Sequence, residues 1–533
     1  MNQPIKAIAK RCTPSMIVNS TIAHQGHASI GERRVTLQAL WDRGARLASA
    51  LARRGVCEDQ AVAVLMRNDL CFLEAAIATA MLGAYAVPIN WHQTGEEIAY
   101  ILRDADIRVL LAHTDLLANL RASLPAGMAV IAQPTPEDIR QAYGASGHVS
   151  EVPMDVEALE AVIADSAPMQ DRSRVGTRSS IVYTSGTTGH PKGVRRFALP
   201  PEAARAFTSL TQQWFEVRPG IRTVMAGPMY HSAPNTYMRA VLYAGGSIAL
   251  MPRFDAAELL ALIERERVTH LHLVPTMMVR LLRLPEAVRR RHDLSSLEFV
   301  IHGAAPCALD IKRAMIDWWG PIIHEYYGAT ETGMVTRSSS EEWMARPGTV
   351  GRAWPGREVR IYGEDGRRLL ANEVGEVYVS LQGVPNFTYQ NADAQRADID
   401  REGFVTNGDV GYLDAEGYLF IVDRKKDMVI SGGVNIYPAE IECALAGHPA
   451  VVDSAVIGVP DEEFGEQVVA FVRPAEDVPV DASALEGFLR QRIAGFKVPR
   501  RFVFVRELPR DESGKLVKRK LREPYWAGRV RQV

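Results

Sequence analysis

Short apolar runs alternate with amphipathic helical patterns along most of this chain, and that alternation restricts its fold more than any other feature. The runs Ala61–Leu65 and Val109–Ala112 contain no polar residue, which is typical of strands buried on both faces. After Thr36, apolar residues recur with helical spacing until Gly55, so a helix is predicted there. The alternation returns after residue 181, with runs at Thr223–Ala226, Ser247–Met251, His270–Val274 and Phe299–His302. It indicates an α/β fold of mainly parallel sheets covered by helices, with ligands at the carboxyl ends of strands.

The pattern changes further along the chain, where strand-length segments such as Glu358–Tyr362 and Glu376–Ser380 accompany turn residues. Such hairpins predict a β-rich subdomain. A chain of 533 residues is longer than one hydrophobic core usually organises, so a smaller second domain is expected. We place the boundary at the charged run Asp423–Asp427, which separates two hydrophobic segments. The resulting division is an N-terminal domain of residues 1–424, a connection at 425–426 and a C-terminal domain of residues 427–533.

The composition excludes several classes of protein. With 47% hydrophobic and 23% charged residues and a net charge of −2, the chain resembles an ordinary globular protein and has no bias toward nucleic acid. Its most apolar stretch, Phe72–Trp91, is interrupted by polar residues and no signal-peptide pattern is present, so no transmembrane segment is expected. The cysteines are odd in number and lack metal-ligand spacing, which favours reduced thiols and a cytoplasmic location. They are Cys12, Cys57, Cys71, Cys307 and Cys443.

The sharpest local feature is the segment Tyr183–Gly193, with the sequence YTSGTTGHPKG, which follows an apolar strand signal. Glycines allow backbone N–H groups to converge on phosphate oxygens, hydroxyls add donors and Lys192 adds positive charge. It is not a Walker A loop, because no Ser or Thr follows the lysine. The alternative is a flexible turn. We predict a phosphate-binding loop formed by Thr184, Ser185, Gly186, Thr187, Thr188, Gly189 and Lys192.

This loop resembles the phosphate-binding signature of the adenylate-forming superfamily, which includes acyl-CoA synthetases, nonribosomal adenylation domains and firefly luciferase. Four further motifs resemble that family's signatures and occur in the family's order. They are His324–Glu331 (HEYYGATE), Thr406–Gly411 (TNGDVG), Asp423–Asp427 (DRKKD) and Pro509–Lys515 (PRDESGK). The resemblance extends from about residue 181 to residue 515 and is most like bacterial fatty-acyl or bulky-acyl CoA ligases. It implies ATP and coenzyme A as cosubstrates, Mg²⁺ as the metal and a mobile α+β C-terminal domain.

The resemblance assigns roles in the first half-reaction, in which a carboxylate attacks the α-phosphate of ATP. Glu331 is expected to bind Mg²⁺, which prefers carboxylate and phosphate oxygens, together with Thr187 of the loop. Thr330 is expected to contact the α-phosphate. Lys515 is expected to reach the acyl carboxylate and the α-phosphate, although composition alone would make it one more charge in a basic tail. Lys192 completes the set of phosphate ligands.

Three other parts of the chain are expected to bind the nucleoside. The resemblance implies that the adenine contacts Tyr327 on one face and lies against the backbone of the segment Gly303, Ala304 and Ala305, while Glu325 accepts a hydrogen bond from the adenine amino group. Tyr326, Tyr327 and Gly328 belong to the same motif, and the alternative is that the tyrosines are core aromatics. Asp409 and Arg424 are expected to hold the ribose hydroxyls, because a carboxylate and a guanidinium suit vicinal hydroxyls.

The second half-reaction is expected to use the small domain in another orientation. Lys426 is the hinge by its position in the DRKKD motif, and Gly432 and Gly433 resemble the glycines that admit the pantetheine arm of coenzyme A. His231, in the segment PMYHS, resembles the residue placed between the nucleotide and the acyl pocket. A lone histidine is more often structural, so that alternative stays open.

The sequence therefore predicts an ATP-dependent acyl-CoA synthetase acting on a medium-chain, long-chain or bulky hydrophobic acid. A ligase serving a separate acyl-carrier protein is the main alternative. A luciferase-like monooxygenase and a non-catalytic relative are further alternatives, and the second is disfavoured because every motif position holds a chemically competent residue. The expected partners are small molecules only, and the assembly is left open, with a homodimer among the options.

Overall fold

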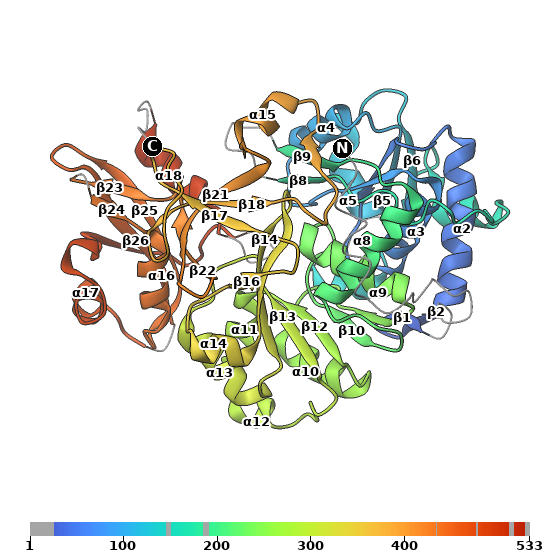
Figure 1. The fold of residues 1–533 in the computed structure, drawn as a ribbon. Coiled ribbons are helices and arrows are strands. Elements are labelled where there is room, and N and C mark those ends of the chain that lie inside the picture. Colours follow the sequence, from blue (N-terminus) through green and yellow to red (C-terminus); the bar gives the residue numbers. More distant parts are fainter. Residues whose placement is uncertain are drawn as a thin grey trace.

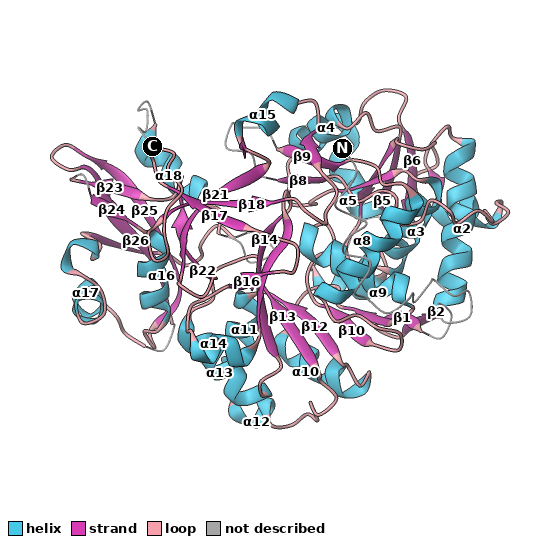
Figure 2. Ribbon diagram, viewed as in Figure 1, coloured by secondary structure: helices cyan, strands magenta, loops and turns pink. Residues whose placement is uncertain are grey.

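The computed structural model describes residues 26–144, 151–184, 191–432, 434–475, 478–510 and 516–527, apart from the side chain of residue 119. Figures 1 and 2 show a broad body formed by the N-terminal and central elements, with the elements from β23 onward gathered at one side, on the left in both views. No helix among the described residues has the length and apolar character needed to cross a lipid bilayer.

A five-stranded parallel sheet lies on the far side of the body from the C-terminal elements (Figure 1). Its strand order is β4 (Tyr85–Pro88), β3 (Ala61–Leu65), β5 (Val109–His113), β6 (Ala129–Gln133) and β7 (Glu157–Ala158). Helices accompany its strands, and they are α2 (Leu37–Arg53), α3 (Leu70–Leu82), α4 (Gly95–Asp104), α5 (Thr114–Leu120), α6 (Glu137–Ala142) and α7 (Leu159–Ala164). Every residue of α3 is buried, since this helix is packed between other elements, as a helix that is apolar all round must be.

The largest sheet has 14 strands and joins a parallel part to an antiparallel part. The parallel part comprises β1 (His27–Ile30), β11 (Ser247–Leu250), β10 (Arg222–Met225), β12 (His270–Leu273), β13 (Phe299–His302) and β14 (Ile323–Ala329), with β2 (Arg33–Thr36) antiparallel at its edge. The antiparallel part comprises β15 (Gly333–Ser338), β16 (Gly351–Ala353), β22 (Tyr418–Arg424), β21 (Phe404–Leu413), β18 (Gly375–Ser380), β17 (Val359–Tyr362) and β20 (Asp400–Arg401). The change from parallel to antiparallel pairing falls between β14 and β15.

Helices connect the parallel strands of this sheet (Figure 2). They are α9 (Ser232–Ala244), α10 (Ala256–Arg265), α11 (Pro275–Leu282), α12 (Glu286–Arg289) and α13 (Leu309–Trp319). α8 (Pro201–Trp214) precedes β10, and α14 (Ser340–Ala345) and α15 (Asp393–Asp398) follow later in the chain. A small antiparallel sheet of β8 (Val182–Thr184), β9 (Lys192–Arg196) and β19 (Phe387–Tyr389) lies beside them.

The C-terminal elements form a separate five-stranded sheet. It contains β23 (Val429–Ser431), β24 (Val434–Ile436), β25 (Val451–Asp461), β26 (Gly465–Pro474) and β27 (Arg501–Phe504), with helices α16 (Pro438–Ala446), α17 (Ala482–Arg490) and α18 (Lys518–Trp526). β22 ends the large sheet at Arg424 and β23 begins the small one at Val429. The side chain of Arg283, the residue that follows α11, donates to the carbonyl oxygens of Val451 and Val452 at 3.0 and 2.9 Å, which joins the two parts.

Local sequence signals explain many of these boundaries. Thr36 caps α2 by accepting a hydrogen bond from the backbone N–H of Ala39 at 3.1 Å, as its place before the apolar pattern predicts. Thr94 and Glu97 form a capping box at the start of α4. The α/β fold, with a large domain, a β-rich part and a smaller C-terminal domain, is confirmed.

One hairpin differs in detail from the sequence prediction. β17 and β18 do pair in antiparallel register, with Tyr362 opposite Glu376, but the turn after β17 does not connect them directly. That turn closes a smaller loop in which Tyr362 bridges Arg368. Gly366, with φ of +77°, allows the chain to reverse within five residues instead of continuing into β18.

Candidate active site

The end of β13 continues into the segment Gly303–Ala305, which was predicted to line the adenine site. A Cβ atom on Gly303 would lie 2.6 Å from the ring of Tyr326, so only glycine fits against that ring. Ala304 has φ of +69°, a left-handed conformation that is uncommon for a residue with a side chain. The backbone is thus exposed at a strand end, where parallel sheets present their ligand sites.

The neighbouring strand β14 carries the predicted adenine residues. Glu325 is buried, and its Oε2 atom lies 2.6 Å from the Nζ atom of Lys312, which is also buried. Burial raises the pKa of Glu325, whereas the ammonium group of Lys312 lowers it. Tyr326 is a core aromatic whose hydroxyl contacts the ring of His272 at 3.0 Å. The sequence does not reveal Lys312 as a partner of Glu325, since a lysine within a helical pattern gives no sign of a buried partner.

Tyr327 and the two residues expected to hold ribose are brought together. The hydroxyl of Tyr327 donates to Oδ2 of Asp409 at 2.7 Å, and Nε of Arg424 lies 3.4 Å from Oδ1 of the same carboxylate. Asp409 and Arg424 are directly opposite each other on β21 and β22. Gly328 follows Tyr327 at a β-bulge, where a Cβ atom would lie 2.1 Å from the carbonyl oxygen of Gly333.

The turn between β14 and β15 presents Thr330 and Glu331. Arg196 donates to the carbonyl oxygens of both residues, at 2.9 and 3.1 Å, and thereby holds the turn. The hydroxyl of Tyr389 donates to Oε1 of Glu331 at 3.3 Å, and Nζ of Lys192 lies 5.5 Å from the centre of the Tyr389 ring. The predicted phosphate lysine and the predicted metal ligand therefore contact the same tyrosine.

Two buried arginines behind this turn are functional candidates that the sequence did not reveal. Arg196 is buried and Arg357 donates to the carbonyl oxygen of Thr332 at 2.8 Å. Burial lowers the pKa of both guanidinium groups, and the charge of Arg196 lowers that of Arg357 further. Neither forms an ion pair with a described carboxylate. The negative charge of Glu331 raises the pKa of Arg196 and so offsets part of this positive charge; the remainder favours a nearby polyanion. Isolated arginines in strand or loop segments carry no sequence signal for this role.

His231 lies in the loop before α9, and Asn68 fixes that loop. The side-chain amide of Asn68 donates to the carbonyl oxygens of Gly227 and Met251 at 3.0 and 3.1 Å and accepts from the backbone N–H of Met229 at 2.9 Å. Asn68 thereby joins the N-terminal sheet to the strand ends of the large sheet. The His231 ring lies 4.2 Å from the ring of Tyr230, which makes an edge contact with Trp91.

The connection between β22 and β23 leads into the C-terminal part and is held by an ion pair with α18. Lys426 is exposed in the turn between β22 and β23. Asp427 pairs with Arg522 of α18, and Lys518 of the same helix pairs with Glu442 at 2.8 Å. Two basic residues of the C-terminal tail therefore form ion pairs, and one of these pairs fixes Asp427 at the end of the connection. Gly432 has φ of +57° and donates its N–H to the carbonyl oxygen of Phe464 at 2.8 Å.

Several predicted residues lie outside the described residues. They are Ser185, Gly186, Thr187, Thr188 and Gly189 of the phosphate loop, Gly433 and Lys515. Thr184 ends β8 and Lys192 begins β9, so the described strands flank the phosphate loop on both sides.

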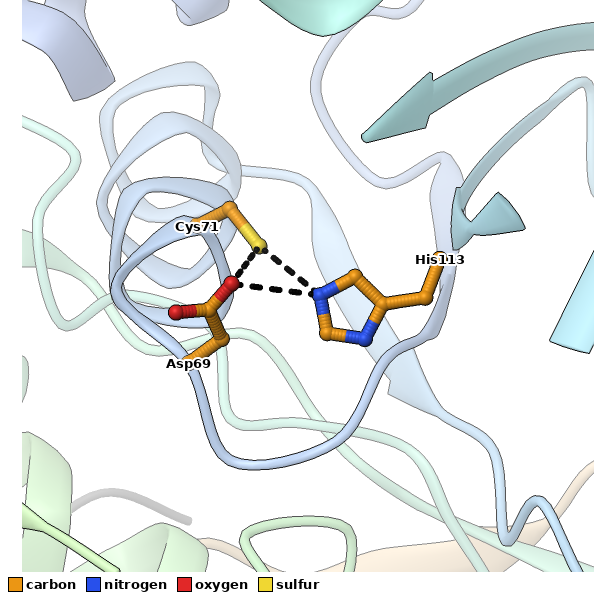
Figure 3. A group of neighbouring side chains, drawn as sticks. All are labelled: Asp69, Cys71 and His113. Carbon is orange, nitrogen blue, oxygen red and sulfur yellow. Dashed lines mark hydrogen bonds and ion pairs between the residues drawn. The ribbon is translucent and has the colours of Figure 1, made fainter. Parts of the chain in front are cut away.

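A separate buried group of side chains is formed by Asp69, Cys71 and His113 (Figure 3). Nε2 of His113 lies 3.2 Å from Oδ2 of Asp69 and 3.4 Å from Sγ of Cys71. The other ring nitrogen, Nδ1, accepts the backbone N–H of Arg67 at 3.2 Å, so the proton of the neutral ring is on Nε2. A protonated nitrogen offers no lone pair to a metal, and the group is therefore a hydrogen-bonded structural network.

Comparisons with known proteins agree with this geometry. The model of the family described as AMP-binding enzyme matches residues 20–385, and the model of the AMP-binding enzyme C-terminal domain matches residues 440–515. The chain is 34% identical to an indoleacetate–CoA ligase of Aromatoleum aromaticum, over 90% of this chain and 91% of that protein. It is 31% identical to a long-chain-fatty-acid–CoA ligase of Bacillus subtilis, over 92% of this chain and 90% of the relative.

A solved structure of ATP-bound MatB from Rhodopseudomonas palustris is also similar. Its TM-score is 0.79 at 29% sequence identity, with 94% of this chain and 96% of that chain covered. These likenesses extend across both parts of the molecule, so the resemblance inferred from the five motifs is confirmed.

Proposed function

Because this chain belongs to the family of AMP-binding enzymes and is thus an adenylate-forming enzyme of the ligase class, we propose that it joins a carboxylic acid to coenzyme A. In the first step a carboxylate oxygen attacks the α-phosphorus of ATP, giving acyl-AMP and pyrophosphate. In the second step the thiol sulfur attacks the acyl carbon, the bond to AMP breaks and the thiol proton is released. The acid would be medium-chain, long-chain or bulky and hydrophobic.

The observation that carries this proposal is the convergence of Lys192, Tyr389 and Glu331 beside the Tyr327–Asp409–Arg424 group. The second group would hold the ribose, because Asp409 retains acceptor capacity after binding Tyr327 and Arg424. Lys192, with Arg196 and Arg357 behind the turn, would offset the negative charge that builds up on the phosphates during displacement. The hydroxyl of Thr330 would donate a hydrogen bond to an oxygen of the α-phosphate.

The residues present also suit Mg²⁺. The Glu331 carboxylate accepts a hydrogen bond from the hydroxyl of Tyr389 at Oε1, and its other lone pairs suit a hard cation that also binds phosphate oxygens. Thr187 would be the second protein ligand. When bound, the ion would neutralise charge on the polyphosphate. Glu331 would hold that charge in place, while Arg196 keeps the turn rigid through two backbone carbonyl groups.

For the second step we propose that the C-terminal part rotates about Lys426. The turn that holds Lys426 separates the large sheet from the small one, so a few torsions there would reorient β23 and β24. Gly432 and Gly433 would then face the acyl-adenylate and leave room for the thiol arm. Lys515 would serve the first step and leave during the second. We place the enzyme in the cytoplasm, where its thiols would stay reduced.

The test is acid-dependent exchange of pyrophosphate into ATP, followed by AMP release with and without coenzyme A. We expect exchange to need only an acid, ATP and Mg²⁺, whereas rapid AMP release should also need coenzyme A. Lys192→Met should reduce exchange, whereas Lys497→Met, which alters a C-terminal lysine paired with Glu440, should not. AMP release that needs a phosphopantetheine-bearing carrier protein instead would support the alternative acceptor. Absence of exchange with every acid in a broad panel would refute the proposal.

A further inference from the structure

Lys312 is a fully buried lysine of helix α13, and its ammonium group faces the large sheet. Its side chain has no exposed surface, and its Nζ atom lies 2.6 Å from Oε2 of Glu325. The same Nζ atom lies 5.0 Å from the centre of the Trp343 ring, which attracts a cation. Lysine is almost never fully buried unless it is paired. The ion pair with Glu325 therefore accounts for the position of Lys312.

Glu325 lies where the predicted adenine contacts meet. On β14 it stands two positions before Tyr327, so the two side chains project from the same face of the strand. Tyr326, between them, belongs to the core on the other face. Glu325 is directly opposite His302 on β13, and the residue after His302 is Gly303, where the exposed backbone segment begins. Glu325 is thus surrounded by the parts of the chain expected to hold the base.

Glu325 keeps one oxygen atom for a ligand. Lys312 binds Oε2, whereas Oε1 forms no hydrogen bond among the described residues. The ring nitrogens of His302 are fully enclosed without a hydrogen-bond partner, but Oε1 is not enclosed in that way. The Glu325 side chain keeps 8% of its surface exposed. An ionised carboxylate only accepts hydrogen bonds, so Oε1 suits a donor such as the amino group of adenine.

Lys312 is the one cation among the described residues whose charge acts on Glu325. Burial raises the pKa of Glu325, while the charge and the hydrogen bond of Lys312 lower it. The other titratable neighbours are His302 and Cys307. Burial lowers the pKa of His302 well below its usual value and raises that of the Cys307 thiol well above its usual value, so both are neutral. Without Lys312, burial would favour a protonated Glu325.

We propose that Lys312 is a positioning residue that keeps Glu325 ionised, so that Glu325 accepts a hydrogen bond from the 6-amino group of ATP and selects ATP over purine nucleotides that lack this group. This inference rests on the proposed function, which makes ATP the nucleotide substrate. Lys312 has no exposed surface and does not contact the nucleotide itself. It acts through the carboxylate of Glu325 on the choice of base.

The experiment measures the Kd of Mg²⁺-ATP and of purine riboside 5′-triphosphate, which lacks only the 6-amino group, by isothermal titration calorimetry without acid or coenzyme A. The parent protein should bind ATP about 10- to 100-fold more tightly at both pH 6.5 and pH 9, as one hydrogen bond to a charged group implies. Lys312→Met should lower this ratio several-fold at pH 6.5, because a protonated carboxyl is a weaker acceptor. The ratio should rise toward pH 9 as the carboxyl ionises.

Two further variants serve as controls. Arg43→Met removes the partner of another buried glutamate, Glu74, whose Oε1 atom lies 2.6 Å from Nε of Arg43, and should lower thermal stability without changing the ratio. Lys312→Met/Glu325→Gln removes both charges and leaves no unpaired buried carboxylate, so it remains measurable if Lys312→Met alone does not fold. Its ratio should be lower than that of the parent protein and should not depend on pH.

The outcomes separate the two proposals. A parental ratio in Lys312→Met at both pH values, a lowered ratio there that does not depend on pH, or a parental ratio in the double variant would overturn the inference while the ligase assignment stands. Equal binding of the two nucleotides by the parent protein would overturn it in the same way. If ATP is preferred but no acid in the broad panel supports pyrophosphate exchange, the proposed function fails and the role of Lys312 in nucleotide selection remains. If ATP does not bind, both proposals fail.

Discussion

The hydroxyl of Tyr327 donates a 2.7 Å hydrogen bond to the carboxylate of Asp409, 82 positions further along the chain. Burial, followed by the charge of Asp409, raises the pKa of Tyr327 well above its usual value, so the phenol remains a donor throughout the physiological range. The bond fixes one carboxylate oxygen, and Arg424 lies beside the other. The group is therefore set before a nucleotide binds.

Tyr327→Phe should raise KM for ATP a few-fold with little change in kcat, because it removes an orienting bond and retains the ring. Loss of one hydrogen bond to a charged group is worth about 1.5–3 kcal/mol, and partial compensation by Arg424 reduces this. Steady-state kinetics at several ATP concentrations give the answer. Tyr418→Phe, which removes a hydroxyl bound to Glu342, is the matched control. If Tyr327→Phe lowered kcat and left KM for ATP unchanged, the proposed role of Tyr327 in nucleotide binding would be wrong.

Glu331→Ala should lower adenylation by about 10²–10³-fold, the usual effect of removing one electrostatic stabiliser. The reason is loss of the carboxylate proposed to bind Mg²⁺ beside Lys192. Pyrophosphate exchange measured across a range of Mg²⁺ concentrations tests it. Glu96→Ala, an exposed change on α4, should behave like the parent enzyme. If Glu331→Ala left pyrophosphate exchange unchanged, the proposal that Glu331 binds Mg²⁺ would be wrong.

Gly432→Leu should preserve pyrophosphate exchange and slow CoA-dependent AMP release, because bulk there would obstruct the thiol path. The position has φ of +57°, so any side chain adds backbone strain, and its Cβ atom would lie 3.1 Å from the ring of Phe464. Gly432→Ala carries the same strain with less bulk and is the matched control. Equal loss in both variants, or loss of both half-reactions, would attribute the effect to strain and not to the path.

Lys515→Ala should nearly abolish acyl-adenylate formation and leave transfer to CoA from supplied acyl-adenylate largely intact, since the lysine can stabilise charge only in the first transition state. Lys426→Pro should give the complementary defect, because proline restricts the torsion on which rotation depends. Single-turnover measurements of each half-reaction show which step each of the two variants slows. The proposed rotation of the C-terminal part between the two steps would be wrong if Lys515→Ala slowed both steps equally or Lys426→Pro slowed neither.

Asp69→Asn should lower the thermal unfolding midpoint by a few degrees at pH 7. Burial raises the pKa of Asp69, but the hydrogen bond from His113 and the positive charge of Arg33 outweigh it and lower the pKa from 3.8 to about 2. A lowered carboxyl pKa stabilises the fold above pH 3.8, and this contribution, about 2 kcal/mol, is lost as the pH falls toward 2.

Scanning calorimetry at pH 7 and at pH 3 tests this prediction, with Asp138→Asn as the control. Asp138 shares Arg33 with Asp69, but its side chain is 34% exposed, so its loss should matter less. The difference between the parent protein and Asp69→Asn should shrink at low pH. A midpoint difference that does not depend on pH would show that the ionised carboxylate is not the stabilising species.

Local patterns sufficed for much of the fold. The limits of β3 and β13 coincide with apolar runs, and α2 begins after its cap, because burial on both faces and helix capping are written in neighbouring residues. The motifs also predicted roles for Glu331, Asp409 and Arg424, and the structure places Asp409 opposite Arg424 on β21 and β22. The sequence did not predict the small loop that follows β17, since turn residues indicate a reversal without specifying which segment pairs next.

The sequence by itself determined the α/β class, the adenylate-forming family and the residues of its motifs, because these depend on residue type and local spacing. Only the tertiary structure decided that Lys312 neutralises Glu325 and that Arg196 and Arg357 lie behind the Thr330–Glu331 turn. Such pairings join residues distant in the chain. They follow from which faces pack together, and no local pattern records which distant side chain a buried charge or donor will meet.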